Sequence, residues 1–268
     1  MKKLFQISTD NAEMIQLVLS IAVGSKNFSF AISNAQANQL YHLACFSADD
    51  MTPDIIAEIL SQHPEASASF YKVAVCYHYS QHVLVPQEFY STESFSEVWK
   101  EVHGVSSSKN IISEPVAEWQ LNSVYAIPQD IQQFLSRRYP AASFKHFATL
   151  GLKLKPEDEV RGVFQVNFAV DEFEVIAFKQ GKLLLAEQFE YSTPPDVIYH
   201  LLNICEQYSL SQYEVQLKIS GLVDKNSALY KELYQYFLNI DFREASWTHQ
   251  DYPLHFFTQL NDIARCVS

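Results

Sequence analysis

The chain has 268 residues, of which 48% are hydrophobic, and a formal net charge of −12 at pH 7. This hydrophobic content excludes intrinsic disorder for most of the length and is sufficient for one large domain or two smaller ones. The negative charge, without a local basic cluster, argues against nucleic acid and anionic membrane surfaces as partners.

The cysteine pattern and the hydropathy predict a cytoplasmic protein. No C-x-x-C pair occurs, and the spacings match no common zinc framework, so we expect buried free thiols, which suit a reducing compartment. No segment resembles a signal peptide, and no apolar run reaches the ~18–20 residues of a membrane span. The cysteines are Cys45, Cys76, Cys205 and Cys266.

The first half begins with three predicted strands. An apolar run over 17–23 predicts the first strand, and 24–27 has turn composition. Phenylalanine and isoleucine alternate with small residues over 28–32, which is typical of a half-buried strand. The third strand is predicted over 40–46.

A helix and a fourth strand complete this half. Thr52, Pro53 and Asp54 have the composition of a helix start, with a hydroxyl cap, a proline at the first helical position and an acid facing the helix dipole. The helix is expected to end near residue 63, and 71–77 to return as a strand.

The middle of the chain carries additional elements. We predict a helix over 93–103 and a strand or hairpin over 110–119, within an extra segment of about 80–122. A strand over 123–127, a helix over 129–139 and an extended segment over 142–150 follow. The charged stretch 155–161 interrupts the pattern, so the boundary between the halves is placed there.

The second half repeats the order of the first. Strands are predicted over 163–170, 173–178 and 183–189, then a helix over 193–208, a strand over 213–219 and a helix over 227–238.

The two halves also match residue by residue, which indicates an internal duplication. Pro53 matches Pro195, 142 positions later, and the same offset pairs Tyr71 with Tyr213 and Val73 with Val215. The upstream strands match at slightly larger offsets, and the differences fall in turns, where insertions cost little. The alternative is chance likeness between apolar β-rich segments.

Each half therefore predicts a βββαβ unit in which the fourth strand runs parallel to the first. We predict an α/β protein of two tandem ribonuclease H-like units with mixed sheets. The first lobe is expected over residues 1–158 and the second over 159–268.

Four motifs give the chain a recognisable resemblance. They are Leu84-Val85-Pro86, Gly181-Lys182-Leu183-Leu184, residues 193–202 and Ser220-Gly221. With the strand–helix–strand of 124–150 between the units, the chain resembles the superfamily of actin, sugar kinases and heat-shock chaperones. More narrowly, it resembles an uncharacterised Bacteroidetes protein family, a domain of unknown function with a duplicated actin-like ATPase fold. The resemblance covers nearly the whole chain and implies a fold, without an assigned activity.

The resemblance also implies where a nucleotide would bind. In active members, the turn after the first strand of each lobe carries Asp-x-Gly, in which the acid holds magnesium and the glycine lets backbone N–H groups approach phosphates. Here Gly24, Ser25 and Lys26 occupy the first turn, but Ala22 replaces the acid. In the second turn Asn167 replaces the acid.

The second turn is also unfavourable for phosphate binding. Ala169 replaces its glycine, and Asp171 and Glu172 place negative charge where a phosphate would approach. At ~4 Å and an effective dielectric near 20, one such charge costs about 4 kcal/mol. Ser220 and Gly221 retain half of an adenosine-side Gly-Gly motif, although Gly221 could equally form a tight turn. We expect a vestigial nucleotide cleft without catalytic residues or a metal site.

Tyrosines and phenylalanine on the helix after Gly221 suggest a protein-binding surface, or else the rim of a bulky core. They are Tyr230, Tyr234, Tyr236 and Phe237.

Two functions remain open. The first is a non-catalytic interaction or assembly module with a protein partner. The second is an ATP-dependent ATPase or kinase that binds Mg-ATP weakly in the cleft between the lobes. The missing acids favour the first, and neither the partner nor the oligomeric state can be predicted.

Overall fold

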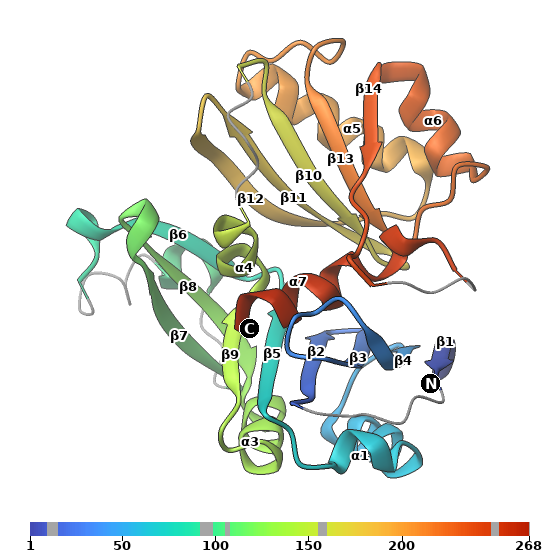
Figure 1. Cartoon of the computed structure of the whole chain (residues 1–268). Coiled ribbons are helices and arrows are strands. Elements are labelled where there is room, and N and C mark those ends of the chain that lie inside the picture. Colours follow the sequence, from blue (N-terminus) through green and yellow to red (C-terminus); the bar gives the residue numbers. More distant parts are fainter. Residues whose placement is uncertain (10–15, 92–98, 105–107, 155–159, 248–251, 268) are drawn as a thin grey trace.

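The chain folds into two lobes that lie one above the other, with helices α4 (Phe147–Lys153) and α7 (Thr258–Val267) between them (Figure 1). The computed structural model describes residues 1–9, 16–91, 99–104, 108–154, 160–247 and 252–267.

The first lobe is built on a six-stranded mixed sheet. Helices α1 (Pro53–Gln62) and α3 (Gln129–Arg138) cover one face, where Ile56, Ile131 and Leu135 are buried. Helix α7 packs against strands of the same sheet. In spatial order the strands are β1 (Lys2–Ser8), β4 (Leu40–Ser47), β3 (Asn27–Ser33), β2 (Val18–Gly24), β5 (Lys72–His78) and β9 (Ser143–His146).

The second lobe is a five-stranded sheet that packs against helices α5 (Pro194–Gln207) and α6 (Ala228–Tyr236). The strands, in spatial order, are β12 (Lys182–Glu190), β11 (Glu172–Lys179), β10 (Val163–Phe168), β13 (Gln216–Gly221) and β14 (Asn239–Phe242).

A three-stranded antiparallel sheet extends from the side of the first lobe (Figure 1). Its order is β6 (His82–Pro86), β8 (Leu121–Pro128) and β7 (Lys109–Val116). Within the predicted helix 93–103, residues 93–98 lie outside the described part of the chain, and 99–103 are helical. Short 3-10 turns occur at η1 (Pro64–Ser67), η2 (Gln87–Phe89), η3 (Ala117–Trp119) and η4 (Leu254–Phe257).

The duplicated βββαβ arrangement is confirmed. Strands β2 and β5 are parallel, as are β10 and β13, and the other pairings within each unit are antiparallel. Both units even share a β-bulge: Tyr41 has no partner in β3, and Leu184 has none in β11, at the corresponding point of each strand. A shared irregularity of this kind is typical of a common origin.

Some local predictions were wrong. The ladder pairs Val73 with Leu19 and Leu217 with Phe164, so Val73 corresponds to Leu217, not to Val215. The 142-residue offset holds along the helix, where Ile56 and Ile198 are both buried, and then shifts by two residues in the loop before the strand.

Two further predictions need correction. The extended segment predicted over 142–150 is a strand only to His146, after which α4 begins. Strand β3 is buried on both faces, because α7 covers the side expected to face solvent, and Ala31 is only 1% exposed. Strands β1 and β14 and helix α7 had not been predicted.

Candidate functional site

The cleft between the lobes is where the resemblance places a nucleotide. The residues that line it lie at the ends of four strands. Strands β2 and β10 point their carboxyl ends at each other from opposite lobes. Each leads into a tight hairpin, β2–β3 or β10–β11, and the neighbouring strands β5 and β13 end beside them.

The two hairpins bond directly to each other. Lys26 Nζ lies 2.6 Å from Asp171 Oδ2, and Asn27 Nδ2 donates to Glu172 Oε1 at 3.2 Å. Both pairs join residues 145 positions apart, which are the corresponding positions of the two repeats. The side chains of the protein thus occupy the space between the hairpins.

Lys26 therefore has a different role from the one expected from the sequence. It was predicted as a phosphate-side residue, but its ammonium group neutralises the Asp171 carboxylate, and that carboxylate raises the pKa of Lys26. Both side chains are more than one-third exposed, so this pair contributes only about 0–1 kcal/mol.

A buried charged cluster lies beneath the hairpins. His78, at the end of β5, has its Nδ1 bonded to the Glu174 carboxylate of β11, and Gln259 of α7 donates to Glu174 Oε2 at 3.2 Å. Burial alone would lower the pKa of His78, but Glu174 raises it well above the ordinary value, so the imidazole is protonated. The cluster therefore joins both lobes and α7 by a buried ion pair.

Glu172 borders the same cluster and has a perturbed carboxyl group. Burial raises its pKa to about 7, and the negative charge of Glu174 acts in the same direction. Only 9% of Glu172 is exposed. The sequence had suggested negative charge at this position, but near neutral pH this carboxyl is partly protonated.

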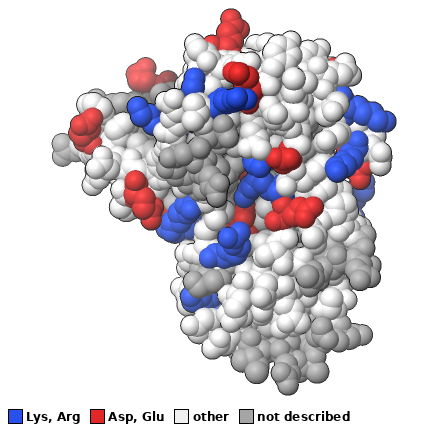
Figure 2. Space-filling view, turned by 45° about the horizontal axis from the view of Figure 1, so that its top comes forward, with Lys and Arg blue, Asp and Glu red and all other residues white. Residues whose placement is uncertain are grey.

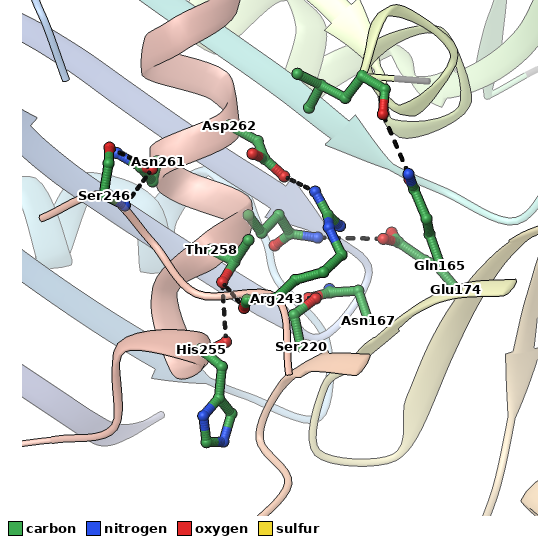
Figure 3. A network of polar contacts seen from close by, with 12 residues as sticks. Gln165, Asn167, Glu174, Ser220, Arg243, Ser246, His255, Thr258, Asn261 and Asp262 are labelled. Atoms are coloured by element: carbon green, nitrogen blue, oxygen red, sulfur yellow. Dashed lines mark hydrogen bonds and ion pairs between the residues drawn. The ribbon is translucent and has the colours of Figure 1, made fainter. Parts of the chain in front are cut away.

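A second polar network closes the other side of the cleft (Figure 3). Arg243, just after β14, bonds to Asp262 of α7 at 2.5 Å, and Thr258 Oγ1 donates to the Arg243 carbonyl at 2.6 Å. Burial raises the pKa of Asp262, and the charge of Arg243 opposes that effect. The network fixes the end of the second lobe to the helix that enters the first.

The remaining cavities in the cleft are small. Two cavities of ≈ 40 Å³ each lie beside His78 and Glu174, and one of ≈ 80 Å³ lies next to Phe168 and Gly221. Such volumes hold only a few water molecules. None of these three cavities can hold a nucleoside triphosphate. A larger cavity, of ≈ 770 Å³, lies beside Ser25 and is lined by Asp50, Lys109 and residues of α3.

Close packing of the backbone explains why Gly24 and Gly221 of the predicted motifs are glycines. A Cβ on Gly24 would lie 2.8 Å from the carbonyl oxygen of His78, with which Gly24 is paired in the sheet. Gly221 has φ +84°, and a Cβ there would lie 2.1 Å from the Phe168 carbonyl oxygen. Close backbone packing requires glycine at both positions, with or without a ligand.

The other predicted positions gather at the same place. Ser220 Oγ donates to Asn167 Oδ1 at 3.1 Å, so the two polar groups satisfy each other. Ser25 lies in the first hairpin, and its carbonyl accepts from the Met51 N–H at 2.7 Å. The fold thus brings five of the six predicted site residues to the cleft, whereas Ser25 lines a separate cavity beside α3. The five are Gly24, Lys26, Asn167, Ser220 and Gly221.

Sequence analysis missed the residues that hold this cleft together. His78 and Glu174 are polar residues within apolar strands, a signal that could have identified them. Gln259, Arg243 and Asp262 carry no such signal, because neither β14, which precedes Arg243, nor α7 had been predicted. Over the described residues, no group of three or more histidine, cysteine or acidic side chains could hold a metal ion.

A comparison with known protein families identifies the family of the chain. A family model described as a protein of unknown function, DUF3822, matches residues 6–240. The chain belongs to the DUF3822 family. No curated protein matches it.

Solved structures establish the fold of this DUF3822 protein. A Bacteroides thetaiotaomicron protein with an actin-like ATPase fold and unknown function is 21% identical, with a TM-score of 0.73 over 85% of this chain and 91% of that chain. A type IV pilus biogenesis complex, PilM–PilN, matches with 13% identity and a TM-score of 0.57 over 94% and 98%. The ethanolamine utilization protein EutJ from Carboxydothermus hydrogenoformans matches with 8% identity and a TM-score of 0.53 over 97% and 92%. The predicted actin-like ATPase fold is confirmed.

Proposed function

We propose that this protein is a non-catalytic actin-fold protein of the cytoplasm that works by binding another protein. The observation that carries the proposal is the direct contact of the two hairpins, Lys26 with Asp171 and Asn27 with Glu172. In this arrangement Lys26, the residue expected on the phosphate side, is bonded to Asp171 of the other lobe, and the cavities that border the Asn27–Glu172 contact measure only ≈ 40 and ≈ 80 Å³.

The chemistry of the cleft supports the same proposal. Ala22 and Asn167 stand where the magnesium-holding acids of active relatives are expected. Opening the cleft for a nucleotide would also separate the His78–Glu174 pair, whose side chains are 7% and 12% exposed. Separating a buried ion pair costs about 3–5 kcal/mol when one charge is left without its partner.

The surface gives a second line of support. On the face shown in Figure 2, basic and acidic side chains are interspersed and no continuous basic area forms, as expected for a chain of net charge −12. Over the described residues, no helix has the length and apolar character needed to cross a membrane. PilM, which has the same fold, is found in a complex with PilN, so this fold can serve as a binding partner.

Titration of Mg-ATP against thermal stability tests the proposal. A ligand present at about 100 times its Kd would stabilise the protein by about 2.7 kcal/mol and raise Tm by several degrees. We expect no rise in Tm relative to magnesium alone, and no release of phosphate. A saturable rise would favour the alternative, an ATP-binding enzyme that uses the cleft.

The interaction half of the proposal needs its own measurement. Tagged protein expressed in its own cells should retain a partner in fixed stoichiometry, or the purified protein should have the mass of an oligomer. A strictly monomeric protein without a stoichiometric partner would contradict the proposal.

A further inference from the structure

The cavity beside Ser25 lies at the carboxyl ends of β2 and β5, on the face of the first sheet that α1 and α3 cover. The loop before α1, the first turn of α3, the β2–β3 hairpin and the start of β7 line it, and its volume is ≈ 770 Å³. Ligands of α/β proteins bind most often at this end of the strands. The contacts between the two lobes described above use none of the side chains that line this cavity.

The floor of the cavity carries a buried hydroxyl group without a partner. Tyr79 is only 8% exposed, and its Oη makes no hydrogen bond to any described residue. Its backbone is fixed, because its carbonyl accepts from His146 Nε2 at 2.9 Å. Burial raises the pKa of Tyr79, and the negative charges of Asp130 and Asp50 act in the same direction, so the hydroxyl lies within electrostatic reach of both acids. Buried polar groups are normally paired, so this hydroxyl indicates a missing ligand atom.

Two carboxylates border the cavity above this hydroxyl. Asp50, in the loop before α1, and Asp130, in the first turn of α3, are both exposed, and neither forms an ion pair with a described residue. The described lining contains one cation, Lys109, whose Nζ donates to Gln81 Oε1 at 2.8 Å. Two carboxylates against one ammonium group leave the lining with an excess of negative charge.

An anion is not favoured here, although two helices begin at the cavity. Their N-terminal N–H groups have partners within the chain, since Ile55 bonds to Thr52 Oγ1 at 3.4 Å and Ile131 bonds to Asp130 Oδ1 at 2.8 Å. Acidic side chains in both first turns, Asp54 and Asp130, also offset the positive ends of the helix dipoles. A ligand anion would be repelled by the carboxylates, whereas a cation would be attracted. The cavity therefore favours a cation that carries several hydrogen-bond donors.

We propose that this cavity binds an arginine side chain of the partner protein, with its guanidinium group between Asp50 and Asp130 and one N–H bonded to the Tyr79 hydroxyl. A guanidinium group offers five donors in one plane and bonds to carboxylates in pairs, whereas a lysine ammonium group is a compact point charge. The cavity exceeds the volume of one side chain, so residues beside the arginine also fit. The inference rests on the proposed function, since it names a feature of the partner that the protein binds.

The peptide acetyl-Gly-Arg-Gly-amide is the probe, and its citrulline analogue is the matched control. Citrulline keeps the shape of arginine and lacks its charge. The full-length protein, labelled with nitrogen-15, is titrated with each peptide, and the amide shifts are followed by NMR. We expect saturable shifts at residues 50–52 and 129–133 with a Kd of about 1 mM, and about tenfold weaker binding of the citrulline peptide. Equal affinities, or shifts that do not saturate up to about 20 mM peptide, would overturn the inference.

Two phenylalanine variants test the buried hydroxyl. Tyr77 is a matched control, because it is fully buried, its hydroxyl also has no partner among the described residues, and it does not line the cavity. Tyr79→Phe should weaken binding of the arginine peptide by about tenfold and leave Tm no lower, since no bond within the protein is lost. Tyr77→Phe should leave Kd unchanged. An unchanged Kd in Tyr79→Phe, or an equal loss in both variants, would contradict the proposed contact.

Two double variants test the carboxylates. Asp50→Asn with Asp130→Asn should weaken binding of the arginine peptide by about tenfold or more. Asp49→Asn with Asp54→Asn makes the same change of charge at exposed positions next to the cavity that do not line it, and should change Kd by less than about twofold. Equal losses would mean that the peptide responds only to the overall negative charge of the protein, and the inference would fail.

Free amines are the other source of the same chemistry. Spermidine and free arginine are titrated in the same way, and we expect neither to bind more tightly than the peptide. If either binds at least about tenfold more tightly, the ligand is a small amine and the assignment to a partner protein fails.

Capture of the stoichiometric partner separates this inference from the proposed function. We expect Tyr79→Phe and the variant with Asp50→Asn and Asp130→Asn to lose the partner that the wild type retains. A partner that both variants retain in full would overturn the inference, while the proposed function would stand. A rise in Tm with Mg-ATP would contradict the non-catalytic function, whereas peptide binding that depends on Tyr79 would still support the arginine site.

Discussion

In the cleft, side chains from three elements form a direct contact between the two lobes. His78, Glu174 and Gln259 come from β5, β11 and α7, so their contacts hold three elements together. His78 and His82 lie on consecutive strands but have different partners, since His78 bonds to Glu174 and His82 bonds to the Ala186 carbonyl.

Glu172 makes the stability of this interface depend on pH. Its pKa is about 7 in the folded protein, above the ordinary glutamate value of 4.5, so the folded state holds a proton that the unfolded state has already released between these values. Stability must therefore fall as pH rises from about 4.5 to about 7. We predict that Glu172→Gln removes this loss, so that the variant gains up to about 3 kcal/mol relative to the wild type across that interval.

Urea unfolding at a series of pH values measures this difference. His78 contributes little to the slope over most of this interval, because its pKa is raised and its contribution is lost only as pH rises above the ordinary histidine value of about 6.5. Unfolding free energies that run parallel in wild type and Glu172→Gln would contradict the prediction.

At the scale of elements, the sequence predicted best where local chemistry decides the structure. Thr52 does cap α1, since its Oγ1 accepts from the Ile55 N–H, and Thr193 and Asp196 form a capping box on α5. These starts were visible because capping depends on neighbouring residues. The βββαβ order followed from turns and apolar runs in the same way.

Elements that depend on distant partners could not be predicted locally. α4 follows β9 directly, and its residues Phe147–Leu150 are apolar without a clear period, because both lobes bury them. β1 is an edge strand whose partner, β4, lies more than 30 residues further along the chain, and β14 is an edge strand of only four residues. The aromatic surface expected on α6 is smaller than the sequence suggested, because Phe237 is fully buried. Tyr234 does belong to the surface, since 61% of it is exposed.

The glycines and turns in the sequence were sufficient to locate the cleft. They could not predict the contacts between the two hairpins that fill it. Lys26 and Asp171 were both identified in the sequence, as a phosphate-side cation and a repelling charge. Their pairing depends on how the two lobes face each other, which no local pattern encodes.

The turn after β13 provides a prediction at this scale. Gly221→Ala forces an alanine into φ +84° and places its Cβ 2.1 Å from the Phe168 carbonyl oxygen, so β10 or β13 must shift. We predict a loss of about 3 kcal/mol or more in unfolding free energy by urea denaturation.

Gly104→Ala is the matched control. Gly104 has a similar φ of +75°, but nothing lies within 4 Å of the added Cβ, so only the backbone strain of about 1–2 kcal/mol remains. Equal losses in the two variants would mean that close packing against Phe168 is not the reason for glycine at 221.

At the scale of the whole molecule, the chain crosses between the lobes twice. It first passes through α4 and later returns through α7, which leaves the second lobe and packs on β2, β3 and β5 of the first (Figure 1). The first lobe expected from sequence, residues 1–158, is thus completed by contacts from the end of the chain. The expected boundary itself falls in 155–159, outside the described residues.

Asn261 is the residue of α7 that best tests this coupling. It is 1% exposed, its Nδ2 donates to the Ala37 carbonyl of the first lobe at 2.7 Å, and its Oδ1 accepts from the Ser246 N–H at 2.9 Å. Asn261→Ala removes these two bonds and the bond that Ser246 Oγ donates to Oδ1 at 3.0 Å, and should cost about 2 kcal/mol or more. Because the helix belongs to the structure of both lobes, the urea midpoint should fall by the same amount when unfolding is followed by far-UV circular dichroism and by tryptophan fluorescence.

Asn239→Ala, which removes bonds to Tyr213 and Glu214 within the second lobe, should shift both midpoints much less. Separate transitions for the two signals, or a shift in only one of them, would show that the lobes unfold independently and that α7 does not couple them.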